Sequence, residues 1–145
     1  MKELIALKME CIKDLLSETG GFSIAVEGDS MLPTLKSGDI VYITPCNRDI
    51  KKNDIVLYVY GNNLVLHRII KLINHSMIVK GDNEETIDII NIDRILGIAE
   101  VKKEKRAIKN VLYRRYNKNN IGFVFLIEDG ILKEIQLSEN IGESN

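Results

Sequence analysis

The chain has 145 residues, of which 45% are hydrophobic and 28% charged, and its formal net charge is −1 at pH 7. This composition is that of one ordinary globular domain with its own core, and it excludes a disordered or fibrous protein. The low net charge excludes a strong overall field toward nucleic acid or anionic lipid. The longest apolar runs, such as residues 55–60, are far shorter than the about 20 residues of a membrane-spanning helix. We therefore expect a cytoplasmic protein without a transmembrane segment, at most peripheral at a membrane.

Two lone cysteines, Cys11 and Cys46, have no metal-ligand spacing. They fit a reducing compartment, while a single disulfide between them stays open. At the N-terminus, apolar residues recur at helical spacing over residues 2–19, and Gly20-Gly21 ends the pattern. The polar face of this predicted helix mixes lysines with acidic residues. That mixture favours packing on the domain's own core over binding to anionic lipid.

From Phe22 onward the pattern changes to short apolar runs separated by turn residues, which is typical of an antiparallel β domain. An acidic stretch, residues 81–93, is predicted to be a polar loop. Two runs flank Glu128-Asp129-Gly130 and predict a C-terminal β-hairpin. The predicted strands cover residues 22–26, 40–43, 55–60, 64–72, 76–80, 95–101, 121–127 and 131–137.

The segment Lys102–Arg115 is rich in lysine and arginine, and its apolar residues have helical spacing. It predicts a basic amphipathic helix, most often a solvated face with one buried stripe; peripheral docking on a membrane or a protein partner stays an alternative. We accordingly expect a single domain over residues 1–145. Its predicted parts are an N-terminal helix (1–20), a β core (22–103), a basic helix with the hairpin (104–137) and a frayed tail (138–145).

The most informative stretch is residues 26–35, Val-Glu-Gly-Asp-Ser-Met-Leu-Pro-Thr-Leu. Gly28 can take backbone angles closed to other residues, and Pro33 fixes φ, so the segment predicts a rigid bend that presents Ser30. A nucleophilic serine needs such a place, because preorganised N–H donors stabilise the oxyanion formed on attack. On these residues alone, an ordinary turn is an equal alternative.

A serine hydroxyl also needs a base within hydrogen-bond reach, and the chain has two histidines. His75 lies in a polar turn and is expected to be exposed. His67 lies inside the predicted strand 64–72, where alternation places it on one face with Val65 and Ile69. A histidine on an apolar face is by itself more often a core residue. Beside the serine bend, we interpret His67 as the candidate base.

An ordered series of short motifs over residues 22–103 resembles the signal peptidase I and LexA-like serine peptidase superfamily. Residues 28–35 and 37–41 resemble its nucleophile region, and Asn53-Asp54-Ile55-Val56 matches the next motif. His67 stands where many bacterial members carry lysine. Histidine at this position is the mark of the endoplasmic-reticulum-type, Ser-His branch. The acidic motif of that branch and the strand after it are matched by Lys80-Gly81-Asp82-Asn83, Asp88 and residues 95–101.

The resemblance implies a mainly β, signal peptidase/LexA-like antiparallel fold with an N-terminal helix and a C-terminal helix plus hairpin. It implies Ser30 as nucleophile and oxyanion donor through its backbone N–H, and His67 as general base. Asp88 or Asp82 would orient the base, and Asp88 is favoured. Arg68 lies on the opposite strand face from His67 and needs a partner such as Asp82. The residues expected to shape the site without reacting are Arg68, Pro33, Met31 and Gly28.

The activity so implied is that of a serine endopeptidase that cleaves a signal or leader peptide from a precursor through an acyl-enzyme. Substrate is expected to bind as an added strand. No nucleic-acid partner, metal or cofactor is expected, because the acidic loop lacks metal-ligand spacing and no phosphate-binding glycine loop occurs. This sequence shows neither a membrane anchor nor a DNA-binding domain, so we expect a soluble single-domain member. Two alternatives stay open: a non-catalytic binding or regulatory domain that retains the fold, and a self-cleaving repressor-like peptidase domain.

Overall fold

The computed structural model describes residues 2–100, 112–118 and 121–137. One helix and ten strands make up these residues, together with a short 3₁₀ turn, η1, at Ile92–Arg94. The elements are α1 (Lys2–Thr19), β1 (Phe22–Ala25), β2 (Ile40–Pro45), β3 (Ile55–Tyr60), β4 (Asn63–Ile73), β5 (Ser76–Lys80), β6 (Asp88–Asn91), β7 (Ile95–Glu100), β8 (Leu112–Lys118), β9 (Ile121–Glu128) and β10 (Ile131–Leu137).

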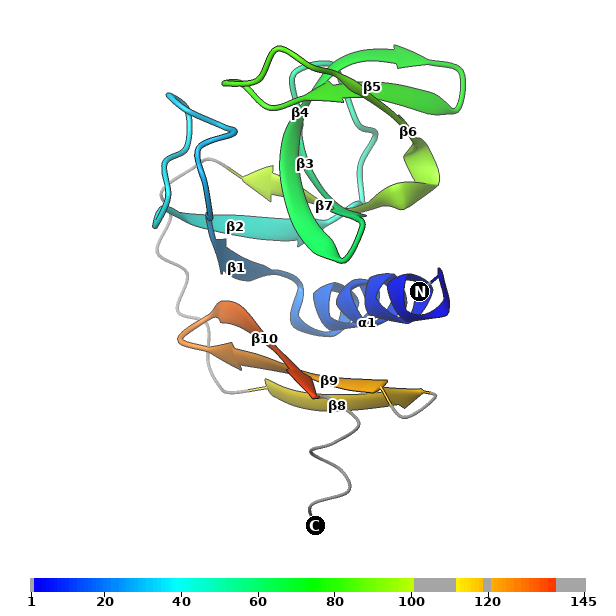
Figure 1. Cartoon of the computed structure of the whole chain (residues 1–145), viewed down its shortest axis with the longest axis vertical. Helices are drawn as coiled ribbons and strands as arrows, with labels where there is room; N and C mark the ends of the chain where they lie inside the picture. The colour runs from blue at the N-terminus through cyan, green and yellow to red at the C-terminus, as the bar shows by residue number, and fades with distance from the viewer. Residues whose placement is uncertain (1, 101–111, 119–120, 138–145) are drawn as a thin grey trace.

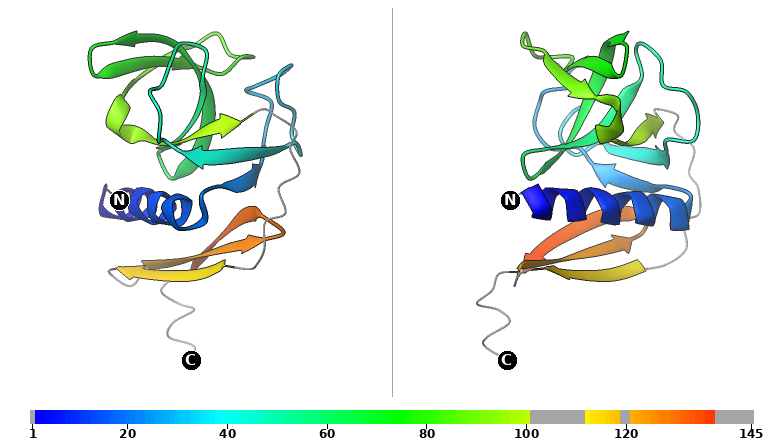
Figure 2. Two further views of the ribbon diagram at one scale, coloured as in Figure 1. Left: turned by 180° about the vertical axis from the view of Figure 1, so that it is seen from behind. Right: turned by 90° about the vertical axis from the view of Figure 1, so that its right-hand side faces the viewer.

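The described strands join into one sheet in the order β6-β5-β4-β3-β7-β2-β1-β10-β9-β8. Neighbouring strands are antiparallel except β1 and β10, which meet in parallel at the single pair Ser23 and Ile131. Strands β2 to β7 curl above helix α1, and β8 to β10 form a layer below it (Figure 1). The two further views also place α1 between these parts (Figure 2). The mainly β, antiparallel fold expected from the sequence is therefore confirmed.

Helix α1 lies between the two parts because apolar side chains cover it on both sides. Ile12 and Leu15 are fully buried in a core cluster that also holds Phe22 of β1 and Phe125 of β9. Burial of such side chains stabilises the fold by about 1.5–3 kcal/mol each. The helix ends as the sequence predicted, with Gly20 at a positive φ of 78° and its N–H donating to the Leu16 carbonyl.

Strand β3 is buried on both of its faces, which explains its continuous apolar run. Ile55 and Leu57 face the core around α1, whereas Val56 and Tyr58 face a second cluster with Ile69 of β4. A strand covered on both faces needs no alternation with polar residues. β3 therefore separates the two cores, and the side chain of Tyr58 belongs to the second one.

A two-residue turn at Gly61-Asn62 joins β3 to β4 and fixes their register. From it follow the pairs Tyr58 with Val65 and Val56 with His67. Side chains directly or diagonally opposite on one face of an antiparallel pair lie within reach of each other. The register thus places His67 on the same face as Tyr58.

Two sequence predictions are wrong in part. Residues 112–115, expected at the end of a basic helix, lie in β8, which pairs with β9 along its whole length. Pairing with a distant strand outweighed a local helical spacing that rested on a few apolar residues. The rest of that expected helix, up to residue 111, lies outside the described residues. Asp88–Asn91, expected in a loop, form β6, which adds antiparallel to β5.

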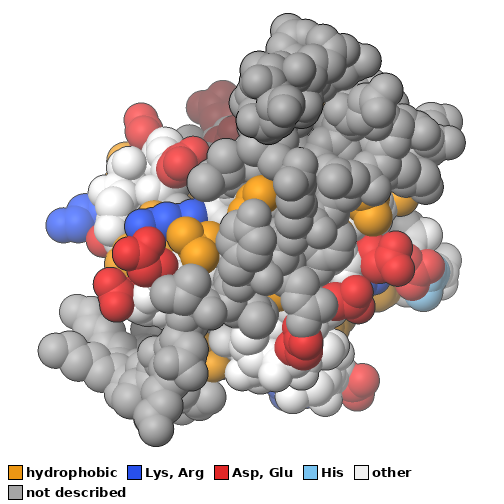
Figure 3. Space-filling model, turned by 90° about the horizontal axis from the view of Figure 1, so that it is seen from below, with side chains coloured by type: hydrophobic (Ala, Val, Ile, Leu, Met, Phe, Trp, Pro, Cys, Tyr) orange, Lys and Arg blue, Asp and Glu red, His pale blue; other side chains and the backbone are white. Residues whose placement is uncertain are grey.

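In the described part of the chain, no helix is long and apolar enough to cross a membrane. Seen from below, the described residues of the molecule show acidic and basic side chains beside hydrophobic ones (Figure 3). The described residues on this side therefore have a mixed charge.

Candidate active site

Ser30 lies in the bend that follows β1, and two buried side chains fix that bend. Met31 and Leu35 belong to the core, and the Leu35 N–H donates to the Met31 carbonyl at 2.9 Å. Gly28 has a φ of 78°, which a residue with a side chain rarely adopts. The Leu32–Pro33 peptide bond is cis. A bend after β1 is what the sequence predicted for this segment, and Ser30 is half-buried in it.

The loop after β5 is tied to this bend by backbone contacts. The Asn83 N–H donates to the Ser30 carbonyl at 2.8 Å, and the Asn83 side chain donates to the Asp29 carbonyl at 3.1 Å. A Cβ on Gly81 would lie against Glu84 Oε1 and only 2.6 Å from the Ser30 carbonyl oxygen. The absence of a side chain at Gly81 therefore permits the approach of Glu84 to the Ser30 backbone.

His67 has a partner at each ring nitrogen. The Tyr58 hydroxyl lies 2.8 Å from Nδ1, and the two rings meet edge to face with centroids 5.8 Å apart. Glu84 Oε1 lies 3.1 Å from Nε2. The Tyr58 side chain is fully buried, whereas that of Glu84 is 40% exposed. The ring therefore has one partner in the core and one in a loop at the surface.

Burial controls the protonation of this pair. Loss of solvent lowers the pKa of His67, an effect opposed by the charges of Glu84, Asp88 and Asp82. Burial also raises the pKa of Tyr58, and the charges of Asp88 and Glu84 raise it further. At neutral pH the ring is consequently uncharged and the phenol keeps its proton.

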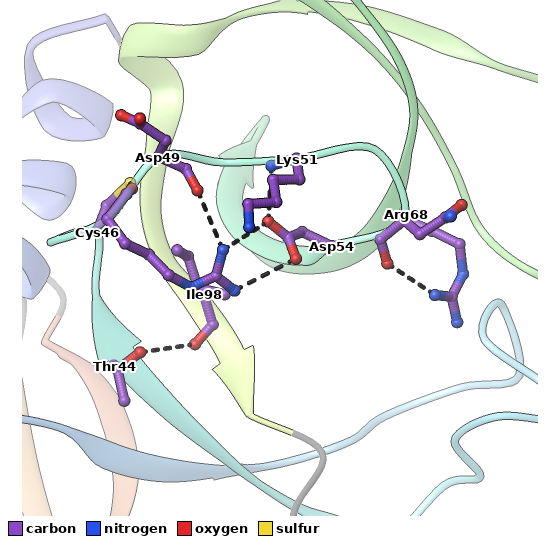
Figure 4. Close-up of polar contacts among 9 residues, drawn as sticks. Thr44, Cys46, Asp49, Lys51, Asp54, Arg68 and Ile98 are labelled. Atoms are coloured by element: carbon purple, nitrogen blue, oxygen red, sulfur yellow. Dashed lines mark hydrogen bonds and ion pairs between the residues drawn. The ribbon is translucent and has the colours of Figure 1, made fainter.

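Arg68 pairs with Asp82, as the sequence analysis suggested. Its Nε and Nη2 donate to the two oxygens of Asp82 at 2.8 and 2.9 Å. Its Nη1 donates to the Asn53 carbonyl at 2.8 Å, and this third contact is the one drawn at Arg68 in Figure 4. Thr34 of the serine bend donates to Asp82 at 2.5 Å. These contacts, led by that with Arg68, hold the pKa of Asp82 below its usual value. Asp82 thus joins β4, the bend and the loop after β5.

A second arginine–carboxylate pair supports the start of β3. Arg48 donates to both oxygens of Asp54 at 3.0 and 3.2 Å, and the Lys51 N–H donates to the same carboxylate at 2.8 Å (Figure 4). The Arg48 guanidinium is more exposed than that of Arg68. This pair belongs to the turn before β3 and not to the surroundings of His67.

The structure brings Ser30, His67 and Glu84 to one groove, with a cavity volume of about 870 Å³. Asp88, on β6 opposite Val79, acts on His67 through its charge, while the ring's hydrogen-bond partners are Tyr58 and Glu84. The assignments of Asp88 and Asp82 as the orienting acid stay predictions. Among the described residues, neither the Ser30 hydroxyl nor its N–H makes a hydrogen bond.

The groove runs between two strand edges that lack partners within the described residues. On the groove side β1 pairs with β10 only at Ser23, so Ile24 and Ala25 are left unpaired there. β4 pairs with β5 only from Arg68 onward, so residues 63–67 have a free edge. Residues 131–134 of β10 line the groove as well. Two free edges beside a serine are suited to an extended peptide, which forms main-chain hydrogen bonds with such edges.

Sequence reasoning missed Tyr58 and Glu84. The signal for Tyr58 was present, because a two-residue turn at residues 61–62 determines the β3–β4 register. Glu84 gave no such signal, since its place depends on how the loop after β5 folds back onto Ser30. Among the described residues no group of three histidine, cysteine or acidic side chains is placed to hold a metal ion.

Comparison with family models matches residues 4–105 to the family described as Peptidase S24-like. Comparisons with curated proteins and with solved structures give no significant match. The matched region covers α1 to β7, and with them the serine bend and His67. Strands β8 to β10 lie beyond it.

Proposed function

The chain belongs to the Peptidase S24-like family, and on this premise we propose that it is a serine endopeptidase with Ser30 as nucleophile and His67 as general base. The family and the fold support a serine peptidase of the LexA and signal peptidase type. The observation that carries the proposal is the groove, which has Ser30 and His67 in its wall and unpaired strand edges on both sides.

In this mechanism the substrate binds extended along the free edges of β1 and β4. Nε2 of His67 takes the proton of the Ser30 hydroxyl while Oγ attacks the scissile carbonyl carbon. The Ser30 N–H, which makes no hydrogen bond within the described residues, donates to the oxyanion. The imidazolium then protonates the leaving amine, and water hydrolyses the acyl-enzyme with His67 again as base.

We propose that Asp88 acts on His67 through its charge. It favours the imidazolium that forms in each step, in keeping with its upward effect on the pKa of His67. Asp82 is proposed to hold the loop and the bend together through Arg68 and Thr34. In this scheme neither aspartate touches the reacting atoms.

We further propose that the substrate is the signal or leader segment of a precursor, and that the chain belongs to the Ser-His branch of the superfamily. His67 in place of lysine supports the branch. Apolar residues along the groove, such as Ile24, Val26 and Leu64, support a substrate with apolar side chains facing them. The cytoplasmic location and the docking role of Lys102–Arg115 stay proposals.

The test is a mass-spectrometric search for cleavage products after the protein has been incubated with a synthetic peptide library. Wild type and His75→Ala are expected to give the same products, while Ser30→Ala and His67→Ala lose about 10³-fold or more of the rate. His75 is a matched control because it is an exposed histidine paired with Asp93 outside the groove. No cleavage by wild type would favour the non-catalytic alternative. Ser30-dependent fragments of the protein itself would favour the self-cleaving one.

A further inference from the structure

Ser30 and His67 line one groove, yet both ring nitrogens of His67 already have other partners. Nδ1 contacts the Tyr58 hydroxyl at 2.8 Å and Nε2 contacts Glu84 at 3.1 Å. Only a nitrogen with a free lone pair can take the serine proton. One of these two contacts must therefore break before the ring can act as a base.

The chemistry of the partners fixes the protonation of the ring in this state. An ionised carboxylate only accepts hydrogen bonds, so Nε2 must carry the proton that points to Glu84. In the neutral ring Nδ1 is then unprotonated and accepts from the Tyr58 hydroxyl. The ring thus presents an N–H, and no lone pair, toward the groove.

Burial decides which contact is exchangeable. Tyr58 lies in the middle of β3, fully buried in the second core together with Val56 and Ile69, and its ring cannot turn away without opening that core. Glu84 lies in the loop after β5 and is 40% exposed, so a rotation of its side chain moves the carboxylate into water. The nitrogen that becomes free is therefore Nε2, which already faces the groove.

Resting on the proposed function, we propose that Tyr58 is the residue that positions His67 for catalysis, and that Glu84 must leave Nε2 before Ser30 can give up its proton. A substrate strand beside Ser30 displaces the Glu84 carboxylate, because both occupy the same groove. One proton leaves Nε2 to water and one is gained at Nδ1 from water, so the ring stays neutral and the solvent gains no net charge. The Tyr58 O–H turns away from Nδ1, and Nδ1–H then donates to the Tyr58 oxygen.

In this second arrangement the proton transfer balances without any further group. The Oγ–H bond of Ser30 breaks, its proton goes to the lone pair of Nε2, and its electron pair forms the bond to the carbonyl carbon. The resulting imidazolium donates through Nδ1–H to Tyr58, a charge-assisted bond stronger than the neutral one. The charged groups that act on the ring are Glu84, Asp88 and Asp82.

The first test is NMR on the full chain with ¹⁵N-labelled histidine, since it needs no substrate. His75→Gln assigns the two histidine signals. We expect neutral His67 in wild type to carry its proton on Nε2. Removal of the hydroxyl in Tyr58→Phe is expected to lower the His67 pKa further, because the imidazolium loses its acceptor. The control Tyr60→Phe alters an exposed hydroxyl two residues along the same strand and should leave the pKa unchanged.

The second test is kcat/KM on a peptide that wild type cleaves. Tyr58→Phe is expected to lower it at least tenfold with a melting temperature close to that of wild type. Glu84→Gln is expected to raise kcat/KM severalfold. The control is Glu85→Gln, which changes an exposed neighbour and is expected to leave kcat/KM unchanged.

The inference is overturned by a proton on Nδ1 of resting His67, by an unaltered His67 pKa in Tyr58→Phe, or by a loss of tenfold or more in Glu84→Gln. That loss would make Glu84 an acid that assists the base. If no peptide is cleaved, the proposed function fails, while the NMR result still decides which groups hold the ring.

Discussion

Replacement of Arg68 by alanine is expected to lower the stability of the fold as well as the activity. The change removes two hydrogen bonds to Asp82 and one to the Asn53 carbonyl. It leaves Asp82, whose side chain is 15% exposed, with Thr34 as its described side-chain partner. Bonds to charged groups contribute about 1.5–3 kcal/mol each, and partial exposure reduces this, so we expect a loss of about 3 kcal/mol in the free energy of unfolding. For a chain of this size the loss corresponds to a fall in Tm of about 10 °C.

The pH dependence of the stability difference between wild type and Arg68→Ala identifies Asp82 as the source of that difference. Arg68 holds the pKa of this carboxyl below its unfolded value, so the stabilisation is present above about pH 4 and is lost as the pH falls through the lowered pKa. Melting curves followed by circular dichroism at pH 7 and at pH 3 are the assay. Arg48→Ala, which removes the more exposed arginine pair, is the control with a smaller expected shift. A Tm of Arg68→Ala within about 2 °C of wild type at pH 7 would refute this reasoning. So would a loss of Tm in this variant that is as large at pH 3 as at pH 7.

Three further outcomes are expected. The pH profile of kcat/KM should rise in one step with its midpoint below 6.5, since burial lowers the pKa of His67 and the neutral ring is the active form. Gly81→Ala should cost about 1–3 kcal/mol and lower the rate, because its Cβ would meet the Ser30 carbonyl oxygen at 2.6 Å. Glu134→Gln should cost about 2–4 kcal/mol, because the ammonium of Lys8, 2% exposed, would lose its charged partner at 2.7 Å and keep, among the described residues, the uncharged Asn62 carbonyl and the new amide as acceptors.

Each of these outcomes has a measurement that contradicts it. A midpoint above about pH 8.5 would indicate a base other than histidine. Wild-type stability and rate in Gly81→Ala, measured by thermal melting and peptide cleavage, would show that the loop has room for a side chain. For Glu134→Gln the matched control is Glu128→Gln, which removes an ion pair to Lys133 that is exposed on both sides. Equal shifts in the two variants would mean that burial of Lys8 does not matter.

The local features of the site were predictable from the sequence. A bend needs glycine and proline at fixed places, so residues 26–35 indicated where Ser30 lies. Strand alternation placed His67 on an apolar face, and the structure has it there with Tyr58, Ile69 and the rest of the second core. These inferences depend on a few neighbouring residues, and local backbone geometry is what a sequence specifies most directly.

Features that depend on distant contacts were not predictable. Asp88 was singled out because it matched a family motif, whereas the carboxylate in contact with His67 belongs to Glu84. Glu84 reaches the ring because the turn at Gly81 and the Asn83–Ser30 hydrogen bond bring the loop after β5 against the serine bend. No local sequence pattern predicts this contact. Residues 112–115 belonged to a segment whose apolar residues had helical spacing, but they pair with β9 and form a strand.

The central claim, that Ser30 attacks the substrate, is tested most directly by trapping the acyl-enzyme. An intact peptide that the protein is known to cleave is mixed with wild-type protein, and the reaction is quenched in acid within its first turnover. The intact mass of the protein is then measured. The account predicts an added mass equal to the N-terminal product less one water, located on Ser30 by peptide mapping and missing in Ser30→Ala. Cleavage that persists in Ser30→Ala, or an adduct on another residue, would contradict it.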